Sequence, residues 1–428
     1  MASSLSVEAG RANLGFMLRT FRYRNYRLFF GGQIVSLCGT WITITATSWL
    51  VYRLTGSAFL LGVVGFASQV PAFLLMPLAG IAVDRWNRHR LLVATQALSM
   101  LTSLTLAALT LTGRITMPAL IGVSIVQGIV TAFDMPVRQA FVIALIEDKR
   151  DIGNAIALNS SMFNAARLAG PTIAGAIIAV SSEGWCFLID GVSFLAVIVA
   201  LLAMHLPSRP ASHDEASIHP LEQLREGWRY ASGSAPIRSM IALVGVVCLL
   251  GIPYSVLLPI YAGDILGGGA HTLGFLMTAA GCGALVGALW LATRSGPEGL
   301  DTIIPAAAAV FGAGLVGFAL SRVLWLSLAF MLVSGFGAMV QFASSNTLLQ
   351  TVVDDRKRGR VLSFFLMAYF GTTPFGSLAE GALSARYGAP ITLAAGGLCC
   401  IAGALWFRTD IASVRGVLTA QRDLAEPV

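Results

Sequence analysis

Apolar residues along the chain are gathered into long runs, and short polar segments separate each run from the next. Twelve runs are long enough to cross a bilayer as a helix, which takes about 20 apolar residues. The spans that we expect are 28–52, 57–83, 91–112, 118–146, 153–181, 185–206, 237–263, 271–293, 302–321, 324–352, 360–385 and 388–407. The pattern predicts an all-α membrane protein. The first run reads as a retained span, because it is too long for a cleaved signal peptide.

One polar stretch is longer than the others and separates six spans from six. Within it, Leu221, Leu224 and Trp228 recur at the spacing of one helix face, which predicts a short amphipathic helix at the membrane surface. The expected domains are an N-terminal six-helix bundle at 1–206, a cytoplasmic linker at 207–236, and a C-terminal six-helix bundle with a cytoplasmic tail at 237–428.

The two halves repeat each other. Residues 145–155 follow span 4 and residues 352–361 follow span 10, and an offset of 206 or 207 residues aligns the acidic pairs of these segments. Nearly the same offset pairs Gly175 with Gly381. Two pseudo-symmetric bundles with a site between them are a known plan of secondary transporters.

Charge is scarce and unevenly placed. The chain has 11% charged residues, whereas soluble domains carry roughly 25%. Of its 28 Lys and Arg residues, 22 fall on one side of the predicted spans, four on the other side and two inside spans. By the positive-inside rule, both termini are cytoplasmic. The net charge of +7 sits in these short clusters, so it indicates topology and not a nucleic-acid partner.

The segment between spans 2 and 3, GIAVDRWNRHR, resembles the loop 2–3 signature of the major facilitator superfamily, G-x-x-x-D-R-x-G-R-[RK]. The residues that match are Gly80, Asp84, Arg85, Arg88 and Arg90. Asn87 replaces the second Gly, and Asn is the residue next best able to adopt left-handed backbone, so we expect the turn to be kept. The resemblance implies a gating latch at the cytoplasmic mouth, and a simple positive-inside anchor is the alternative.

A second motif lies in span 5, where RLAGPTIAG resembles the superfamily's antiporter motif. Ala166, Gly170, Pro171 and Gly175 occupy its main positions, and Ala176 replaces the final Gly. The motif implies a flexible, leak-tight surface between the halves, and ordinary close helix packing is the alternative. Segments 21–42, 133–141, 187–194 and 358–363 further resemble the exporter branch that includes the enterobactin exporter and macrolide-efflux proteins.

The chain departs from the superfamily in span 4. The usual motif places Arg three residues before Gln-Gly, and Ser124 stands there, before Gln127 and Gly128. Proton coupling through that Arg is therefore not implied for this chain.

Four charged side chains form a candidate intramembrane charge network: Asp134, Arg138, Arg167 and Glu380. Each costs at least about 2.5–3.5 kcal/mol if it is unpaired at the bilayer centre. Asp134 and Arg167 lie at similar distances from the turn between spans 4 and 5, so we expect an ion pair between them. Arg138, one turn from Asp134, is the alternative partner. Glu380 is a lone acid that can titrate, and Asp190 lies near the outer end of span 6.

Hydroxyl side chains line one face of span 1. Ser36, Thr40, Thr43 and Thr47 follow a helical spacing. They either line the transport cavity, where the family places span 1, or bond back to the backbone and to neighbouring helices. Further candidates for the cavity are Asn164, Tyr254, Gln341 and Ser345.

The sequence contains no motif of a membrane enzyme, and its six cysteines have no metal spacing. Its two lysines, Lys149 and Lys357, do not follow Gly, so no nucleotide-binding P-loop exists. We expect a monomeric secondary transporter of the bacterial cytoplasmic (inner) membrane, without cofactor, metal or catalytic residues. It would export small amphiphilic molecules of the drug, macrolide or siderophore type in exchange for protons. The alternative is an uncoupled facilitator or an importer of a small metabolite.

Overall fold

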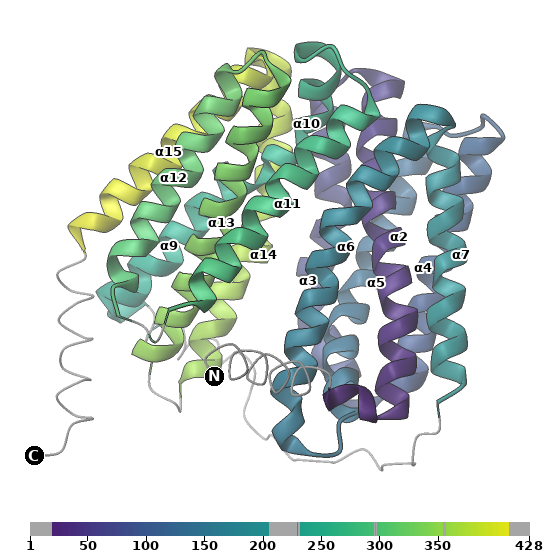
Figure 1. Ribbon diagram of the computed structural model, residues 1–428. Coiled ribbons are helices and arrows are strands. Elements are labelled where there is room, and N and C mark those ends of the chain that lie inside the picture. Colours follow the sequence, from purple (N-terminus) through teal and green to yellow (C-terminus); the bar gives the residue numbers. More distant parts are fainter. Residues whose placement is uncertain are drawn as a thin grey trace, which may run out of the picture. The chain divides into compact units, whose positions relative to one another are not determined.

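The computed structural model describes residues 19–204, 229, 232–294, 296, 298–353 and 357–410. Within these residues, 12 helices are long and apolar enough to cross a membrane (Figure 1). The described residues contain no strand. The prediction of an all-α protein with twelve spans is therefore confirmed, because each long apolar run forms a helix that satisfies its own backbone hydrogen bonds.

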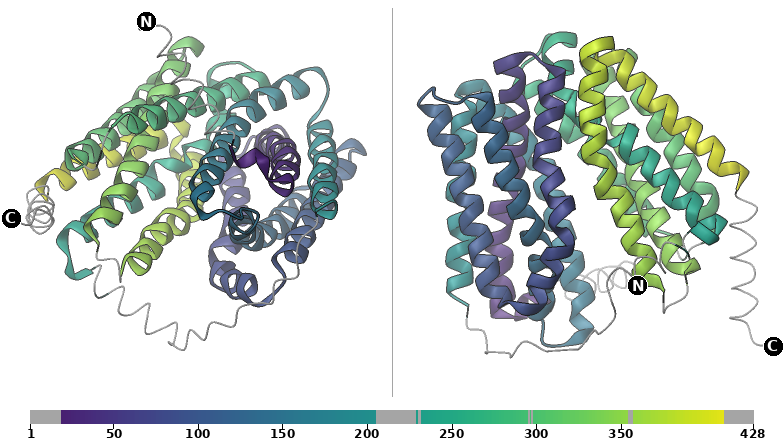
Figure 2. Two further views of the ribbon diagram at one scale, coloured as in Figure 1. Left: turned by 60° about the horizontal axis from the view of Figure 1, so that its bottom comes forward. Right: turned by 180° about the vertical axis from the view of Figure 1, so that it is seen from behind.

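The first half of the chain forms six long helices. Its elements are η1 (Arg19–Arg22), α2 (Arg24–Thr55), α3 (Ala58–Arg85), α4 (Arg88–Leu111), α5 (Met117–Ala144), η2 (Lys149–Asp151), α6 (Ile152–Val180) and α7 (Glu183–Leu202). In Figures 1 and 2, α4 lies along α5 and α7. The tight turns after α2 and α4 use Gly56 and Gly113, at φ +57° and +69°, because a side chain is disfavoured in that region.

The second half forms five long helices and one broken span. Its elements are α9 (Ala235–Leu250), η3 (Ile252–Val256), α10 (Leu258–Ile260), η4 (Tyr261–Ile265), α11 (Ala270–Ala292), α12 (Leu300–Leu320), α13 (Leu324–Val352), α14 (Arg358–Tyr387) and α15 (Ala389–Thr409). The C-terminal helix α15, yellow in Figure 2, packs along α12 and α9.

The span expected at 237–263 is not one regular helix. The α-helix α9 ends at Leu250, and a 3-10 turn, a short α-helical turn and a π-helical turn follow. Pro253 and Pro259 cause this break because neither has an N–H to continue the helical bonding. Gly251 sits at the break against the side chains of Phe311 and Cys400, where a Cβ would not fit.

The chain divides into two compact units. One takes its residues from 1–47 and 74–213, and the other from 48–73 and 214–428. The end of α2 and the start of α3 thus pack with the second half of the chain. The domain boundaries at 206 and 237 remain a prediction, and the amphipathic helix expected at Leu221–Trp228 lies outside the described residues.

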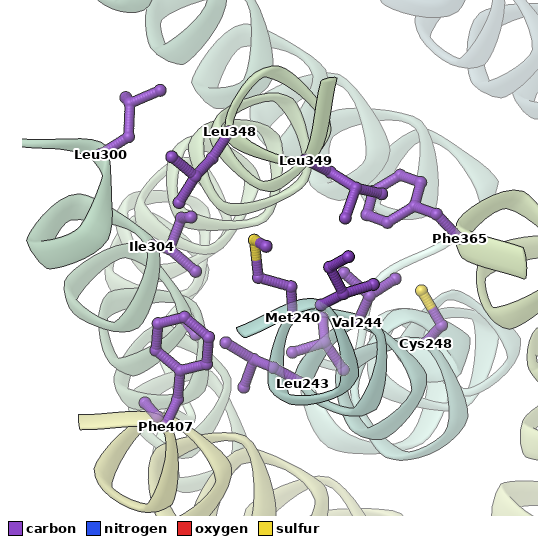
Figure 3. Packing of buried hydrophobic residues seen from close by; sticks show 14 of the residues in the cluster. Met240, Leu243, Val244, Cys248, Leu300, Ile304, Leu348, Leu349, Phe365 and Phe407 are labelled. Carbon is purple, nitrogen blue, oxygen red and sulfur yellow. The ribbon is translucent and has the colours of Figure 1, made fainter. Parts of the chain in front are cut away.

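The main core of the second unit lies where five helices converge (Figure 3). Met240, Leu243, Val244 and Cys248 of α9 meet side chains of α12, α13, α14 and α15. The partners labelled in Figure 3 are Leu300, Ile304, Leu348, Leu349, Phe365 and Phe407. This packing holds α9 against α14, and so positions the break of span 7 beside the middle of α14.

Candidate transport and gating sites

The loop 2–3 motif spans the end of α3 and the start of α4. Gly80 has open space around the position of a Cβ, and Arg85, Arg88 and Arg90 are exposed. The backbone of Asp84 lies in the last turn of α3, and its side chain is outside the described parts of the chain. The motif therefore presents a basic, exposed surface, and its role as a latch stays a prediction.

Asn87 does not adopt the left-handed backbone that we expected in place of Gly. Its φ and ψ are −65° and 111°, and its side-chain oxygen accepts a hydrogen bond of 3.1 Å from the Arg90 N–H. Asn87 is thus the N-cap of α4, a position that favours extended backbone and a short polar side chain. The expectation of a left-handed turn was wrong because the Asn87 side chain accepts a hydrogen bond from the Arg90 backbone N–H, which a glycine at this position would leave without a partner.

Replacing Asn87 by Ala should lower the free energy of unfolding by about 1 kcal/mol, because the cap is lost. Asn87→Gly should cost only a few tenths of a kcal/mol. Thermal unfolding of the purified protein in detergent measures both. Thr116→Ala is the matched control, since Thr116 precedes α5 at the same position but makes no side-chain capping bond. Equal losses for Asn87→Ala and Thr116→Ala would contradict the capping role.

The span 5 motif packs α6 closely against α2. Gly170 lies on the Cβ of Trp41, where a Cβ of its own would overlap it, and Pro171 and Gly175 are also buried. These contacts show close helix packing, the simpler of the two readings of the motif. Arg167, three residues earlier, is half-buried.

The ion pair expected within the intramembrane charge network is not formed between the predicted residues. Asp134 is 8% exposed, and one of its oxygens accepts hydrogen bonds from Thr95 Oγ1 at 2.9 Å and Gln96 Nε2 at 2.6 Å. Its other oxygen lies 3.2 Å from Nη2 of Arg138. The predicted pair of Asp134 with Arg167 is therefore wrong: α4 covers one side of the carboxylate and Arg138 lies one turn away on the same helix. Arg167 pairs with no acid among the described residues.

The bonds to Asp134 belong to a longer polar seam along α4, which the sequence reading missed. Thr102 Oγ1 donates to Gln127 of α5 at 2.6 Å, and Ser103 Oγ donates to Asp190 of α7 at 2.7 Å. The seam residues of α4 are Thr95, Gln96, Ser99, Thr102 and Ser103, all buried. Their spacing of i, i+1, i+4, i+7 and i+8 places them on one helix face, and that periodicity was the available signal.

Asp190 of α7 is hydrogen-bonded both to this seam and to α2, the first span. It is 2% exposed and also accepts a hydrogen bond of 2.8 Å from Thr43 Oγ1. Its second oxygen has no hydrogen-bond partner among the described residues. Gly39 lies directly against Asp190 and Ser193, so α2 approaches α7 closely at this level. Thr43 is therefore bound to a buried acid, although it was selected only as a hydroxyl facing the cavity.

The other cavity candidates form mostly local bonds. Ser36 is buried, Thr40 donates to its carbonyl at 3.1 Å, and Thr47 is half-buried. Asn164 donates to the Ser160 carbonyl at 2.9 Å. In the second unit, Gln341 donates to Ser345 at 3.2 Å with both side chains buried, and Tyr254 stacks edge-on against Phe311. For Thr40 and Asn164 the reading of backbone bonding therefore holds in this structure, and the cavity role stays a prediction.

Glu380 differs from the other intramembrane acids. It lies in α14, is 3% exposed, and neither of its oxygens has a hydrogen-bond partner among the residues that the structure describes. Burying an ionised group without partners is costly. Among the described spans, Glu380 is the acid whose environment least favours a charge.

A cluster of acids and arginines lies at the cytoplasmic end predicted for the first unit. Asp151 of η2 is 2% exposed and is bound by Arg19 at 2.9 Å and Arg22 at 2.8 Å. The neighbouring Asp148 is bound by Arg150, whose hydrogen bonds hold the pKa of that carboxyl below its usual value. The cluster joins the start of the first span to the connection between α5 and α6.

Comparison with known proteins agrees with this architecture. The family profile described as transmembrane secretion effector, within the major facilitator superfamily, matches residues 17–424. The staphyloferrin A transporter of Staphylococcus aureus is 26% identical over 353 residues, which cover 82% of this chain and 87% of the relative. The multidrug efflux pump Tap of Mycolicibacterium fortuitum is 26% identical, covering 83% and 88% of the two chains. Macrolide efflux protein A of Streptococcus pyogenes is 21% identical, covering 63% and 67%.

The fold is also found among solved transporters. The crystal structure of a bacterial homologue of the human lysosomal transporter Spinster, inward-facing and unoccupied, has a TM-score of 0.68 at 14% identity, covering 93% of this chain and 98% of that one. That similarity concerns the fold alone. The profile match, the twelve spans and the loop 2–3 motif together show that the chain belongs to the transmembrane secretion effector family of the major facilitator superfamily and is a multi-pass membrane transporter, not an enzyme.

Proposed function

We propose that the protein exports small amphiphilic molecules from the bacterial cytoplasm by alternating access, as a monomer in the inner membrane, in exchange for protons. The observation that carries this proposal is the family match over residues 17–424, together with relatives named for siderophore transport, multidrug efflux and macrolide efflux. Transport needs an energy source. Because the sequence has no nucleotide-binding P-loop, this energy comes from an ion gradient, the substrate gradient or another subunit, and a proton gradient is the source that we propose.

The polar groups within the spans support an amphiphilic substrate. Those described are mainly hydroxyls and amides, and Arg167 is the half-buried cation without an acid partner among the described residues. Such groups offer hydrogen bonds and little fixed charge, which suits molecules with a large apolar body and a few polar atoms. The class of drugs, macrolides or siderophores is proposed on this chemistry and on the relatives' names.

Ethidium entry into proteoliposomes with entrapped DNA tests the proposal. Ethidium is a permanent cation, so an acidic lumen does not trap it by protonation, and its fluorescence on DNA reports entry. With an acidic lumen, protons leaving through the transporter should drive ethidium in, faster than in liposomes without protein. Addition of a proton ionophore should remove the difference. Entry that needs the protein but ignores the gradient would favour the uncoupled facilitator.

The orientation can be tested by labelling single cysteines in a chain whose six native cysteines are replaced. Trp86, 60% exposed between α3 and α4, should react with an impermeant maleimide as Trp86→Cys only after the cells are permeabilised. The matched position is Arg114, exposed between α4 and α5, which as Arg114→Cys should react in intact cells. The positive-inside asymmetry requires this pattern, and the reverse pattern would place the termini outside.

A gating role for the loop 2–3 motif makes a separate prediction. Asp84→Asn removes the acid of the motif without changing its size, and insertion should be unaffected because the segment lies at the end of a span. Transport in the ethidium assay should fall, while yield and thermal unfolding stay at the wild-type values. A normally expressed variant with wild-type transport would leave the motif as a positive-inside anchor.

A further inference from the structure

The seventh expected span, at 237–263, is broken after α9, and the break leaves backbone carbonyls at the end of α9 without their helical hydrogen-bond donors. Pro253 has no N–H, so the Leu249 carbonyl lacks the donor that a continued helix would supply. Two glycines allow neighbouring helices to reach these carbonyls. Gly376 of α14 lies against the Leu249 oxygen and Gly396 of α15 against the Leu250 oxygen, where in each case a Cβ would overlap.

Glu380 lies at the same place. It follows Gly376 by one turn on α14, and a Cβ on Gly396 would be 3.8 Å from its Oε1. Its carboxyl is 3% exposed and has neither a hydrogen-bond partner nor an ion pair among the described residues. An anion here would face helix C-terminal carbonyls, which carry partial negative charge. The site therefore favours a carboxyl that bears a proton.

We propose that Glu380 is the proton-binding group of the transporter. With its proton the carboxyl carries no charge, whereas loss of the proton leaves an anion that this site does not stabilise. Half-helix ends and unwound carbonyls serve as coupling-ion sites in other transporter folds. The proposal rests on the proton exchange proposed above and names the residue that carries the proton.

Asp134 and Asp190, two other buried acids within the spans, are less suited to this role. Asp134 has Arg138 and two hydrogen-bond donors, and Asp190 has two hydroxyl donors. Hydrogen bonds and an opposite charge stabilise the ionised form of a carboxyl. Within the described parts of the chain, Glu380 has none of these partners.

Other titratable side chains near Glu380 do not supply a counter-charge. The thiol of Cys400 on α15 lies at the break, against Gly251, and Cys248 is buried on α9. The remaining titratable or charged side chains of α9, η3, α13, α15 and α14 itself are Arg238, Tyr254, Cys399, Arg408, Arg358, Arg360, Tyr369, Arg386 and Tyr387. Residues 58–73 of α3, which also lie against α14, contain none. None of these arginines forms an ion pair with Glu380 in the described structure.

Infrared difference spectroscopy on the purified protein in lipid tests the proton directly. The carbonyl-stretch band of a protonated carboxyl should be present in the wild type at neutral pH and absent in Glu380→Gln, an isosteric and neutral change. Asp301→Asn is the matched control, because Asp301 is another buried acid of the same unit, in the first turn of α12, and it should leave the band unchanged. A wild type without the band would overturn the proposal.

A second arm distinguishes a proton from a sodium ion. Exchange of choline for sodium at constant ionic strength should not change the band if the site holds a proton. Disappearance of the band in sodium would overturn the proton assignment in favour of a sodium site. Size-exclusion chromatography checks that each variant is folded, and Glu380→Ala serves as a second variant that should also lack the band.

A transport measurement distinguishes failure of the Glu380 proposal from failure of the proposed proton exchange. In the ethidium assay, Glu380→Gln should lose the stimulation by the pH gradient, so that entry rates with and without the gradient become equal. If the wild type itself shows no gradient-driven entry, the proposed proton exchange fails for this probe, and the infrared band alone decides on Glu380. A Glu380→Gln variant with the wild-type stimulation would overturn the coupling role.

Discussion

Arg138→Gln is expected to reduce the yield of folded protein sharply, and Asp134→Asn in the same chain should restore most of it. The single change leaves the Asp134 carboxylate buried beside Thr95 and Gln96 without its cation. Removing one member of a buried ion pair typically costs about 3–5 kcal/mol, whereas replacing both members is often nearly neutral. Asn at position 134 keeps an oxygen that can accept the bonds from Thr95 and Gln96.

The measurement is a double-mutant cycle on folded yield, by size-exclusion chromatography of the solubilised protein, and on thermal unfolding. Arg167→Gln is the matched control: it removes another half-buried arginine, and the described structure shows no acid paired with it. Its effect should add to that of Asp134→Asn. Coupling of Asp134 to Arg167 instead of Arg138 would contradict the structure. Transport by the double variant then shows whether the pair also takes part in function.

Gly170→Val is expected to abolish close packing of α6 on α2, with a large loss of folded protein. Even the Cβ of Gly170→Ala would overlap the Cβ of Trp41 and lie 3.2 Å from its backbone carbon. Overpacking a tight contact typically costs about 1–3 kcal/mol, and the branched side chain of Val makes the overlap worse. Gly153→Ala on the same helix is the control, because no atom lies within 4 Å of its Cβ position, and it should be neutral or stabilising.

A compensating change separates packing from transport. Gly170→Ala combined with Trp41→Gly removes the Cβ that the new methyl group would meet, and folded yield should rise above that of Gly170→Ala alone. If ethidium transport recovers with it, Gly170 serves packing, the simpler reading of the span 5 motif. If folding recovers and transport does not, the surface formed by α2 and α6 has the functional role that the antiporter motif implies.

The pattern of apolar residues was enough to predict where the chain crosses the membrane, because a bilayer demands about 20 apolar residues and an internally bonded backbone at each crossing. It also identified the superfamily, since the residues of the loop 2–3 motif are close together in the chain and can be matched without knowing the fold. Asp134, Arg138, Arg167 and Glu380 could be selected for the same reason: a charge within an apolar run is conspicuous at the level of sequence.

The partners of those side chains, in contrast, depend on how the helices pack. Asp134 pairs with Arg138 and not with Arg167, because Thr95 and Gln96 of α4 cover one side of its carboxylate. The sequence predicts only that Asp134 and Arg167 lie at similar depths in α5 and α6, and depth does not specify how each helix is rotated about its axis. Asn87 caps α4 because the helix begins directly after it. The distinctive setting of Glu380 depends on three helices meeting at a break whose prolines and glycines are far apart in sequence. Which side chains contact one another depends on which helix faces pack together, and the order of residues along the chain does not specify this.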